Sequence, residues 1–170
     1  MSVAKIGPYT SKDASLSPDG VYRWWLSRGW RPFGVLPERP LVVIGLNPST
    51  ADAAKDDPTI RRCVGFAKSW GHDGLLMLNL FAFRATEPHE LRITSFDPVG
   101  AENDDVIRAN VRGRRVLCAW GTTGFYQDRD QVVLALVRNV GAELVVLGRT
   151  KDGAPKHPLY VPAITQPVPA

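Results

Sequence analysis

The chain of 170 residues is 44% hydrophobic and 22% charged, a composition typical of a folded globular protein and not of a disordered one. Its length suits one domain, and we expect residues 1–170 to form it, with irregular termini at 1–20 and 163–170. The net charge of +4 permits a polyanionic partner but does not require one.

The first half of the chain contains two apolar runs and one helical pattern. Residues 21–26 are aromatic-rich and predict a strand, and residues 31–40, with three prolines, predict a connector. Residues 41–46 form an unbroken apolar run that predicts a strand buried on both faces. A helix is expected after Asp57, because an acidic capping residue precedes proline there, and it ends at Gly71.

The second half continues the alternation of apolar runs and helical patterns. Strands are predicted at 75–81, 116–120 and 143–148, and helices at 101–112 and 129–139. Strands that alternate with helices indicate βαβ units around a largely parallel sheet. We therefore expect an α/β fold.

Three of the predicted strands end in polar segments. The first is followed by Asn47, Pro48 and Ser49, the second carries Asn79, and the third leads into the segment 149–160. Parallel strands place their carboxyl ends on one rim, where α/β proteins bind ligands. We therefore expect the three segments to form one site. An ordinary strand-to-helix turn explains the first segment equally well, because Asn, Pro and Ser all favour turns.

Asn79 and His157 are the side chains in these segments whose chemistry is most specific. An asparagine that closes an apolar strand is costly to bury unless its amide finds partners. Asn79 can offer a paired donor and acceptor to an amide-like edge such as a nucleobase, or it can cap a neighbouring loop. Pro158 restricts the backbone of His157, so the imidazole has a definite direction. The surrounding loop is basic, through Arg149, Lys151 and Lys156, and suits an anionic ligand.

Other classes of site have no motif in this sequence. Cys63 and Cys118 belong to no CxxC pair, and no metal-ligand spacing, Walker motif or dinucleotide-binding motif is present. The first residues show no secretory pattern, and no apolar run is long enough for a membrane span. We expect a cytoplasmic monomer with no cofactor, no metal and no membrane partner.

Together these segments resemble the uracil-DNA glycosylase superfamily. Gly45–Pro48 is similar to its first motif in the mismatch-specific branch, Leu78–Asn79 to the strand that reads the base, and Lys156–Leu159 to its His-Pro motif. The resemblance implies a three-layer α/β/α sandwich with a central, mainly parallel sheet. Over roughly residues 21–162 the chain also resembles domain-of-unknown-function family 1643, on the patterns at 46–52, 56–63 and 79–86.

The glycosylase resemblance implies a hydrolase of DNA repair that removes a damaged or modified base flipped from DNA. Asn79 would bind the base edge, Asn47 would position a water, His157 would donate to the base oxygen, and Leu159 would fill the space left by the base. Asn47 cannot act as a general base, so Asp52 is a further candidate. The expected sets are Asn47, His157 and Asp52 for catalysis; Asn79, Phe81, Tyr22, Pro48 and Ser49 for the base; and Lys151, Lys156, Leu159 and Arg149 for DNA.

Two other functions fit the same residues. A nucleotide- or nucleoside-acting enzyme would use the same pocket without duplex DNA, and the modest charge favours it. A non-catalytic nucleic-acid-binding module would keep the fold, and the absence of a clear general base favours it. The expected partner is therefore DNA or a nucleotide.

Overall fold

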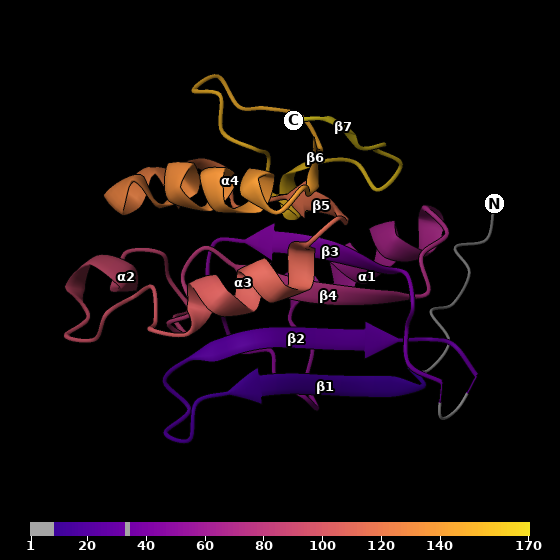
Figure 1. The fold of residues 1–170 in the computed structure, drawn as a ribbon, viewed down its shortest axis with the longest axis horizontal. Helices are drawn as coiled ribbons and strands as arrows, with labels where there is room; N and C mark the ends of the chain where they lie inside the picture. The colour runs from indigo at the N-terminus through magenta and orange to yellow at the C-terminus, as the bar shows by residue number, and fades with distance from the viewer. Residues whose placement is uncertain (1–8, 33–34) are drawn as a thin grey trace.

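A computed structural model describes residues 9–32 and 35–170 (Figure 1). In this part of the chain seven strands form one sheet, in the order β1-β2-β4-β3-β5-β6-β7. The strands are β1 (Ser11–Leu16), β2 (Arg23–Gly29), β3 (Pro40–Gly45), β4 (Gly74–Asn79), β5 (Arg115–Cys118), β6 (Glu143–Val146) and β7 (Val168–Pro169). The helices are α1 (Pro58–Ser69), α2 (Glu90–Ile93), α3 (Asn103–Val111) and α4 (Arg129–Asn139), with 3-10 segments η1 (Gly121–Asp128) and η2 (Pro158–Tyr160).

The sheet is mixed, whereas the sequence predicted a mainly parallel one. The four central strands, β4, β3, β5 and β6, run parallel to one another. The pairings β1–β2, β2–β4 and β6–β7 are antiparallel. The β1–β2 connection is a tight turn in which Gly20 N–H donates to the Ser17 carbonyl, and such a turn can only reverse the chain. The parallel centre still brings the ends of β3, β4 and β6 to one rim.

Two strands lie in segments that the sequence analysis expected to be irregular. β1 occupies 11–16, and β7 occupies two residues of 163–170. β1 is polar because it is an edge strand, with Lys12 and Asp13 exposed to solvent. Its sequence therefore lacks the apolar alternation by which strands are recognised.

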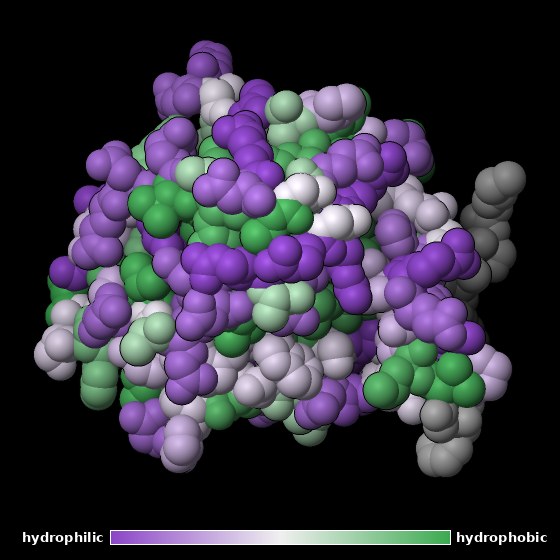
Figure 2. Space-filling view, in the orientation of Figure 1, coloured by the Kyte–Doolittle hydropathy of each residue, from purple (hydrophilic) through white to green (hydrophobic). Residues whose placement is uncertain are grey.

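Helices pack against both faces of the sheet (Figure 1). One hydrophobic cluster joins α1 to residues of β3 and β4 such as Val43 and Leu75. The other joins α3 and α4 to the alternate residues of the same strands, such as Val42 and Leu78. On the face that carries α3 and α4, hydrophilic residues separate small apolar patches (Figure 2), because the apolar sides of these helices are turned toward the sheet. No helix in the described residues is long and apolar enough to cross a bilayer.

A buried arginine on β2 anchors the loop between β3 and α1. Arg28 is fully buried, and its Nε donates a hydrogen bond to Asp56 Oδ1 at 2.8 Å. Its two Nη atoms donate to backbone carbonyls at 2.5–3.4 Å, and the acceptors are Asp13, Ser27, Asp52 and Lys55. A buried charge is tolerated when it is paired and hydrogen-bonded in this way. Arg28 therefore fixes the path of the loop before α1.

We expect Arg28→Met to lower the free energy of unfolding by about 3–5 kcal/mol, because it leaves the partly buried Asp56 carboxylate without its counter-charge. Urea unfolding followed by tryptophan fluorescence measures the loss. As a control, Arg115→Met removes an exposed ion pair with Glu143 and should change the free energy by less than about 1 kcal/mol. Equal losses in the two variants would contradict an anchoring role for Arg28.

Candidate functional site

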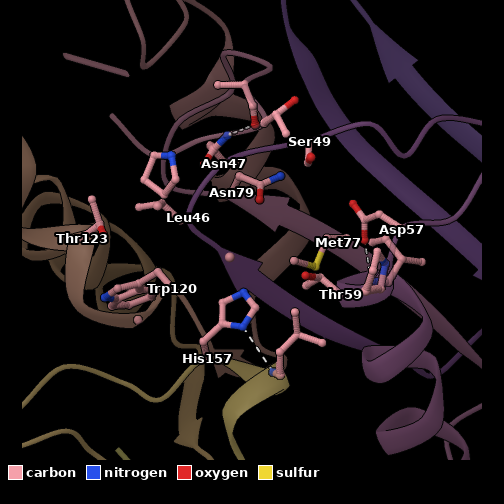
Figure 3. A pocket seen from close by; sticks show the side chains of 18 of the residues that line it. Leu46, Asn47, Ser49, Asp57, Thr59, Met77, Asn79, Trp120, Thr123 and His157 are labelled. Carbon is pink, nitrogen blue, oxygen red and sulfur yellow. Dashed lines mark hydrogen bonds between the residues drawn. The ribbon is translucent and has the colours of Figure 1, made fainter. Parts of the chain in front are cut away.

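A cleft of about 380 Å³ lies where the parallel strands end (Figure 3). Its volume falls within the range of small-ligand sites. β3 and β4 pair in parallel with Gly45 opposite Asn79, so both residues lie at the carboxyl end of the sheet. The cleft is lined by Arg23, Gly45, Leu46, Asn47, Ser49, Asp57, Pro58, Thr59, Ile60, Met77, Asn79, Ala85, Thr86, Pro88, Trp120, Gly121, Thr122, Thr123, His157, Leu159 and Tyr160.

Five of the residues predicted from the sequence line this cleft. They come from three separate strand ends and loops, and they are Asn47, Ser49, Asn79, His157 and Leu159. The three segments therefore do meet at one cleft at the ends of the strands. The other predicted residues lie outside the lining, and they are Pro48, Asp52, Tyr22, Phe81, Arg149, Lys151 and Lys156.

Hydrogen bonds and packing explain the positions of four of these residues, which are Asp52, Arg149, Phe81 and Tyr22. Asp52 accepts the N–H groups of Ala54 and Lys55 at 2.8 Å each, and these two bonds hold the pKa of its carboxyl below the usual value. Asp52 thus stabilises its own turn and takes no part in the cleft. Arg149 likewise donates to the Gly153 carbonyl within its own loop.

The two aromatic residues expected to bind the base have other neighbours. Phe81 is fully buried in the core, where its ring lies 5.8 Å from that of Tyr126. Tyr22 stacks on Trp24, and its hydroxyl donates to the Asp97 carbonyl. Neither ring can therefore contact a ligand in the cleft without rearrangement.

Asn79 lies at the floor of the cleft with an unsatisfied amide. Its side chain is buried, with 1% of the residue exposed, yet neither Nδ2 nor Oδ1 has a hydrogen-bond partner among the described residues. Such orphaned groups are rare in folded proteins, and each costs about 1–3 kcal/mol. The amide offers a ligand one donor and one acceptor side by side.

The backbone beneath Asn79 is held firmly. The Nδ2 of Asn103 donates to the carbonyls of Asn79 and Leu80 at 3.1 and 3.0 Å. Arg129 Nε donates to the Leu80 carbonyl at 2.7 Å. These bonds fix the point at which β4 ends, so the Asn79 amide is presented from a rigid support.

The absence of a side chain at Gly45 leaves space for the Asn79 amide. A Cβ added at Gly45 would lie 2.6 Å from Met77 Cε and 3.1 Å from Asn79 Oδ1. Any side chain there would therefore displace Met77 and crowd the amide. The glycine that ends β3 is explained by this close approach of neighbouring side chains.

His157 presents one ring nitrogen to the cleft. Its Nδ1 accepts the backbone N–H of Leu159 at 3.2 Å, so the neutral ring carries its proton on Nε2. That second nitrogen points toward the middle of the cleft in Figure 3. Burial lowers the pKa of His157, and the nearby Asp57 carboxylate offsets part of this effect. At neutral pH His157 is therefore a neutral hydrogen-bond donor.

Arg62 on α1 holds the backbone that follows His157. Its Nε donates to the Pro158 carbonyl at 3.1 Å and its Nη2 to the Val161 carbonyl at 2.7 Å. The segment η2 is thereby attached to α1 on both sides of its single turn.

The side chain of Asn47 keeps one atom free to bind a ligand. Its Nδ2 donates to the carbonyls of Pro48 and Ala85 at 2.9 Å each, which braces the loop after β3. Its Oδ1 has no hydrogen-bond partner among the described residues. Asn47 can therefore accept a hydrogen bond from a water or a ligand, but it has no donor left to give.

Asp57, Arg23 and Trp120 are three examples of lining residues that were not predicted from the sequence as part of the site. Asp57 does cap α1, since its Oδ1 accepts the Ile60 N–H at 2.8 Å, but it also lines the cleft as the one carboxylate among the described lining residues. Trp120 lies two residues beyond the end of the parallel strand β5, so its place at the same rim could have been predicted. Arg23 lies in an aromatic run that gives no sign of a ligand site.

The chain matches the family described as "Protein of unknown function (DUF1643)" over residues 23–159. This span includes every lining residue of the cleft except Tyr160. Comparison with curated proteins and with solved structures gives no match.

We expect Asn79→Leu to leave the free energy of unfolding unchanged or to raise it, because leucine has a similar size and removes two orphaned polar atoms. Asn103→Leu is the matched control, since Asn103 is equally buried but its amide donates to two carbonyls. We expect that variant to lose about 1–3 kcal/mol in urea unfolding. A loss of the same size in Asn79→Leu would show that the Asn79 amide has a structural partner.

We expect His157 to titrate below its ordinary value of 6.5, because burial disfavours the charged ring. Between 6.5 and the lower folded pKa, the unfolded chain binds more protons than the folded one, so the free energy of unfolding decreases as the pH falls through this window. An NMR titration of the ring protons measures the folded pKa. Asp57→Asn, which keeps a capping side chain, should lower it further. A folded-state pKa of His157 at or above 6.5 would contradict the conclusion that its ring is buried and neutral at neutral pH.

Proposed function

We propose that this chain, which belongs to the family DUF1643, binds a nucleobase in the cleft and hydrolyses its N-glycosidic bond, as a DNA glycosylase does. The observation that carries this proposal is the buried, unpartnered amide of Asn79, which lies across from the free ring nitrogen of His157 (Figure 3). The three-layer α/β/α organisation of the glycosylase superfamily is part of the proposal. The placement of α1 opposite α3 and α4 supports it.

Asn79 would read the edge of the base. Nucleobases carry neighbouring donors and acceptors on their Watson–Crick edges, and enzymes read a flipped base through them. An asparagine amide complements such an edge with its Nδ2 donor and Oδ1 acceptor. Binding would satisfy both orphaned atoms of Asn79, so their cost in the free protein would be recovered in the complex.

His157 would stabilise the leaving base. When the bond between C1′ and the base nitrogen breaks, its electron pair moves into the base and negative charge develops on the base oxygen. The Nε2–H of His157 is a neutral donor that can meet this charge. Donors aimed at developing charge in a water-poor site are among the largest contributions to catalysis.

The hydrolytic water requires an acceptor for its hydrogen bond and another for its proton. The oxygen of the water forms the new bond to C1′, and Asn47 Oδ1 can hold that water. The proton released from the water needs a base, which an amide cannot provide. Asp57, and not the expected Asp52, is the carboxylate that lines the cleft, and it would accept this proton.

The rim of the cleft supports DNA as the source of the base. Leu159 and Tyr160 follow His157 on the rim, and they are 40% and 83% exposed. Apolar side chains in that position can occupy the space that a flipped base leaves in the duplex. Lys151 and Lys156 lie in the same loop outside the cleft, where phosphate contacts would be salt-dependent.

One observation favours a free nucleotide as a second candidate. Among the described residues that line the cleft, Arg23 is the single Lys or Arg side chain, and it is buried. A continuous basic surface for a duplex therefore does not reach the cleft itself.

The test is cleavage of labelled oligonucleotides that each carry one uracil, hypoxanthine, xanthine, alkylated or hypermodified base. We expect abasic sites on at least one substrate, with about 100- to 1,000-fold slower formation in His157→Ala because a charge-stabilising donor is lost. Asn79→Leu should also be inactive while remaining folded. The control is His89→Ala, which removes an exposed histidine outside the cleft and should retain full activity. No cleavage by the wild type, or equal cleavage by His157→Ala, would refute the proposal.

A further inference from the structure

We propose that Arg23 binds a phosphate group of the ligand, so that the cleft recognises a nucleotide unit and not a bare base or nucleoside. This inference rests on the proposed function, because it takes the Asn79 amide as the site of the base. The same cleft would then have two recognition points, the neutral amide of Asn79 for the base and the cationic guanidinium of Arg23 for the phosphate.

Arg23 is a buried cation with unused donors. It lies at the start of β2 with only 2% of the residue exposed, and its Nη1 donates to the Ala51 carbonyl at 2.9 Å. Its Nε is buried and has no hydrogen-bond partner among the residues that the structure describes. The side chain nevertheless lines the cleft. A ligand in the cleft is therefore the available source of the missing acceptor.

Arg28, the other buried arginine of β2, does not share this lack of hydrogen-bond acceptors. Both arginines belong to β2 and both are almost inaccessible to solvent. Every nitrogen of the Arg28 guanidinium donates to a protein oxygen, one of them a carboxylate. Arg23 has one carbonyl and no ion pair within 4.0 Å among the described residues. Arg28 has a structural role, whereas the Arg23 guanidinium still lacks hydrogen-bond acceptors.

The charges around Arg23 leave it available for an anion. The acidic groups that act on it are Asp57 and Asp52, and the basic groups are Arg84 and Arg28. Both carboxylates accept backbone N–H bonds from their own turns, so part of their charge is already satisfied. Burial lowers the pKa of Arg23 to about 10, which leaves the guanidinium charged at neutral pH.

Phosphate is the anion that best completes such a site. A guanidinium presents its N–H groups as a planar fork that matches two phosphate oxygens, and bonds of this kind are stronger than neutral ones. Asn79 and Arg23 line one cleft of about 380 Å³, so a ligand would need a base for one and a phosphate for the other. The phosphate can be the monoester of a free nucleotide or a diester within a strand.

The experiment follows the Arg Nε–H signals of ¹⁵N-labelled protein by NMR. The Arg23 signal is assigned by its absence in Arg23→Lys, and the Arg28 signal is the internal control. The probes are inorganic phosphate, the 2′-deoxynucleosides and 5′-monophosphates of uracil, hypoxanthine and xanthine, and single-stranded trinucleotides with the same bases at the centre. We expect the phosphate-bearing probes to shift the Arg23 signal and leave that of Arg28 in place. The monophosphate should bind at least about tenfold more tightly than its nucleoside.

Two variants separate failure of this inference from failure of the proposed function. Asp57→Asn keeps a helix cap but removes the carboxylate that acts most strongly on Arg23, so phosphate affinity should rise severalfold. Asn79→Leu should weaken nucleosides and monophosphates alike and leave the response to inorganic phosphate unchanged. Nucleoside binding without any preference for the monophosphate or the trinucleotide overturns only the role of Arg23. An Arg23 signal that no phosphate-bearing probe moves also overturns it, whereas phosphate binding that is insensitive to the base overturns the role of Asn79.

Tighter binding of the trinucleotide than of the monophosphate would identify the phosphodiester of a strand as the ligand group, in keeping with a DNA substrate. The reverse order would identify a free nucleotide. In both cases the charge on Arg23 is the shared requirement, and Arg23→Gln should lose the preference for phosphate. Retention of the preference in Arg23→Gln would refute the assignment. Urea unfolding of that variant confirms that it is folded.

Discussion

The shape of the cleft depends on the hydrogen bonds of one buried guanidinium. The segment between β3 and α1 contains no helix or strand, yet it carries Asn47, Ser49 and Asp57. Arg28 holds this segment to the sheet through the Asp56 carboxylate and the carbonyls of Asp52 and Lys55. Because three of its acceptors are in the segment, a shift of any part of the segment would leave a buried donor unpaired. A loop is thereby given the rigidity that a binding site needs.

Part of the site could be predicted because the sequence shows where two buried strands end. The runs that end at Gly45 and Asn79 indicated buried strands, and parallel packing required their ends to meet. Phe81 shows the limit of this reasoning. It would share a face with Asn79 if β4 continued, but β4 ends at Asn79 and the chain turns, so Phe81 enters the core. The exact end of a strand depends on tertiary bonds such as those from Asn103, which the local sequence does not reveal.

Arg23 and Arg28 show a second limit. In the sequence the two arginines are five positions apart, with Arg23 inside the predicted strand 21–26 and Arg28 beyond it, and only the structure places both on β2. Their roles differ because Arg28 donates hydrogen bonds to the loop before α1, whereas Arg23 lines the open cleft. Likewise Asp57 has the sequence features of a helix cap and does serve as one, so its second position beside the cleft is visible only in three dimensions.

The attachment of η2 to α1 couples opposite walls of the cleft mechanically. Asp57 stands at the first turn of α1, and Arg62, less than two turns further along, holds the carbonyls on either side of Leu159 and Tyr160. A tilt of α1 would therefore carry Asp57 and His157 in the same direction, as parts of one rigid body. Their mutual spacing would be preserved, while their distance from Asn79, which is anchored to α3 through Asn103, would change. The bond from Arg28 on β2 to Asp56, the neighbour of Asp57, opposes such a tilt, so the free protein holds Asp57 and His157 at a nearly fixed distance from the Asn79 amide.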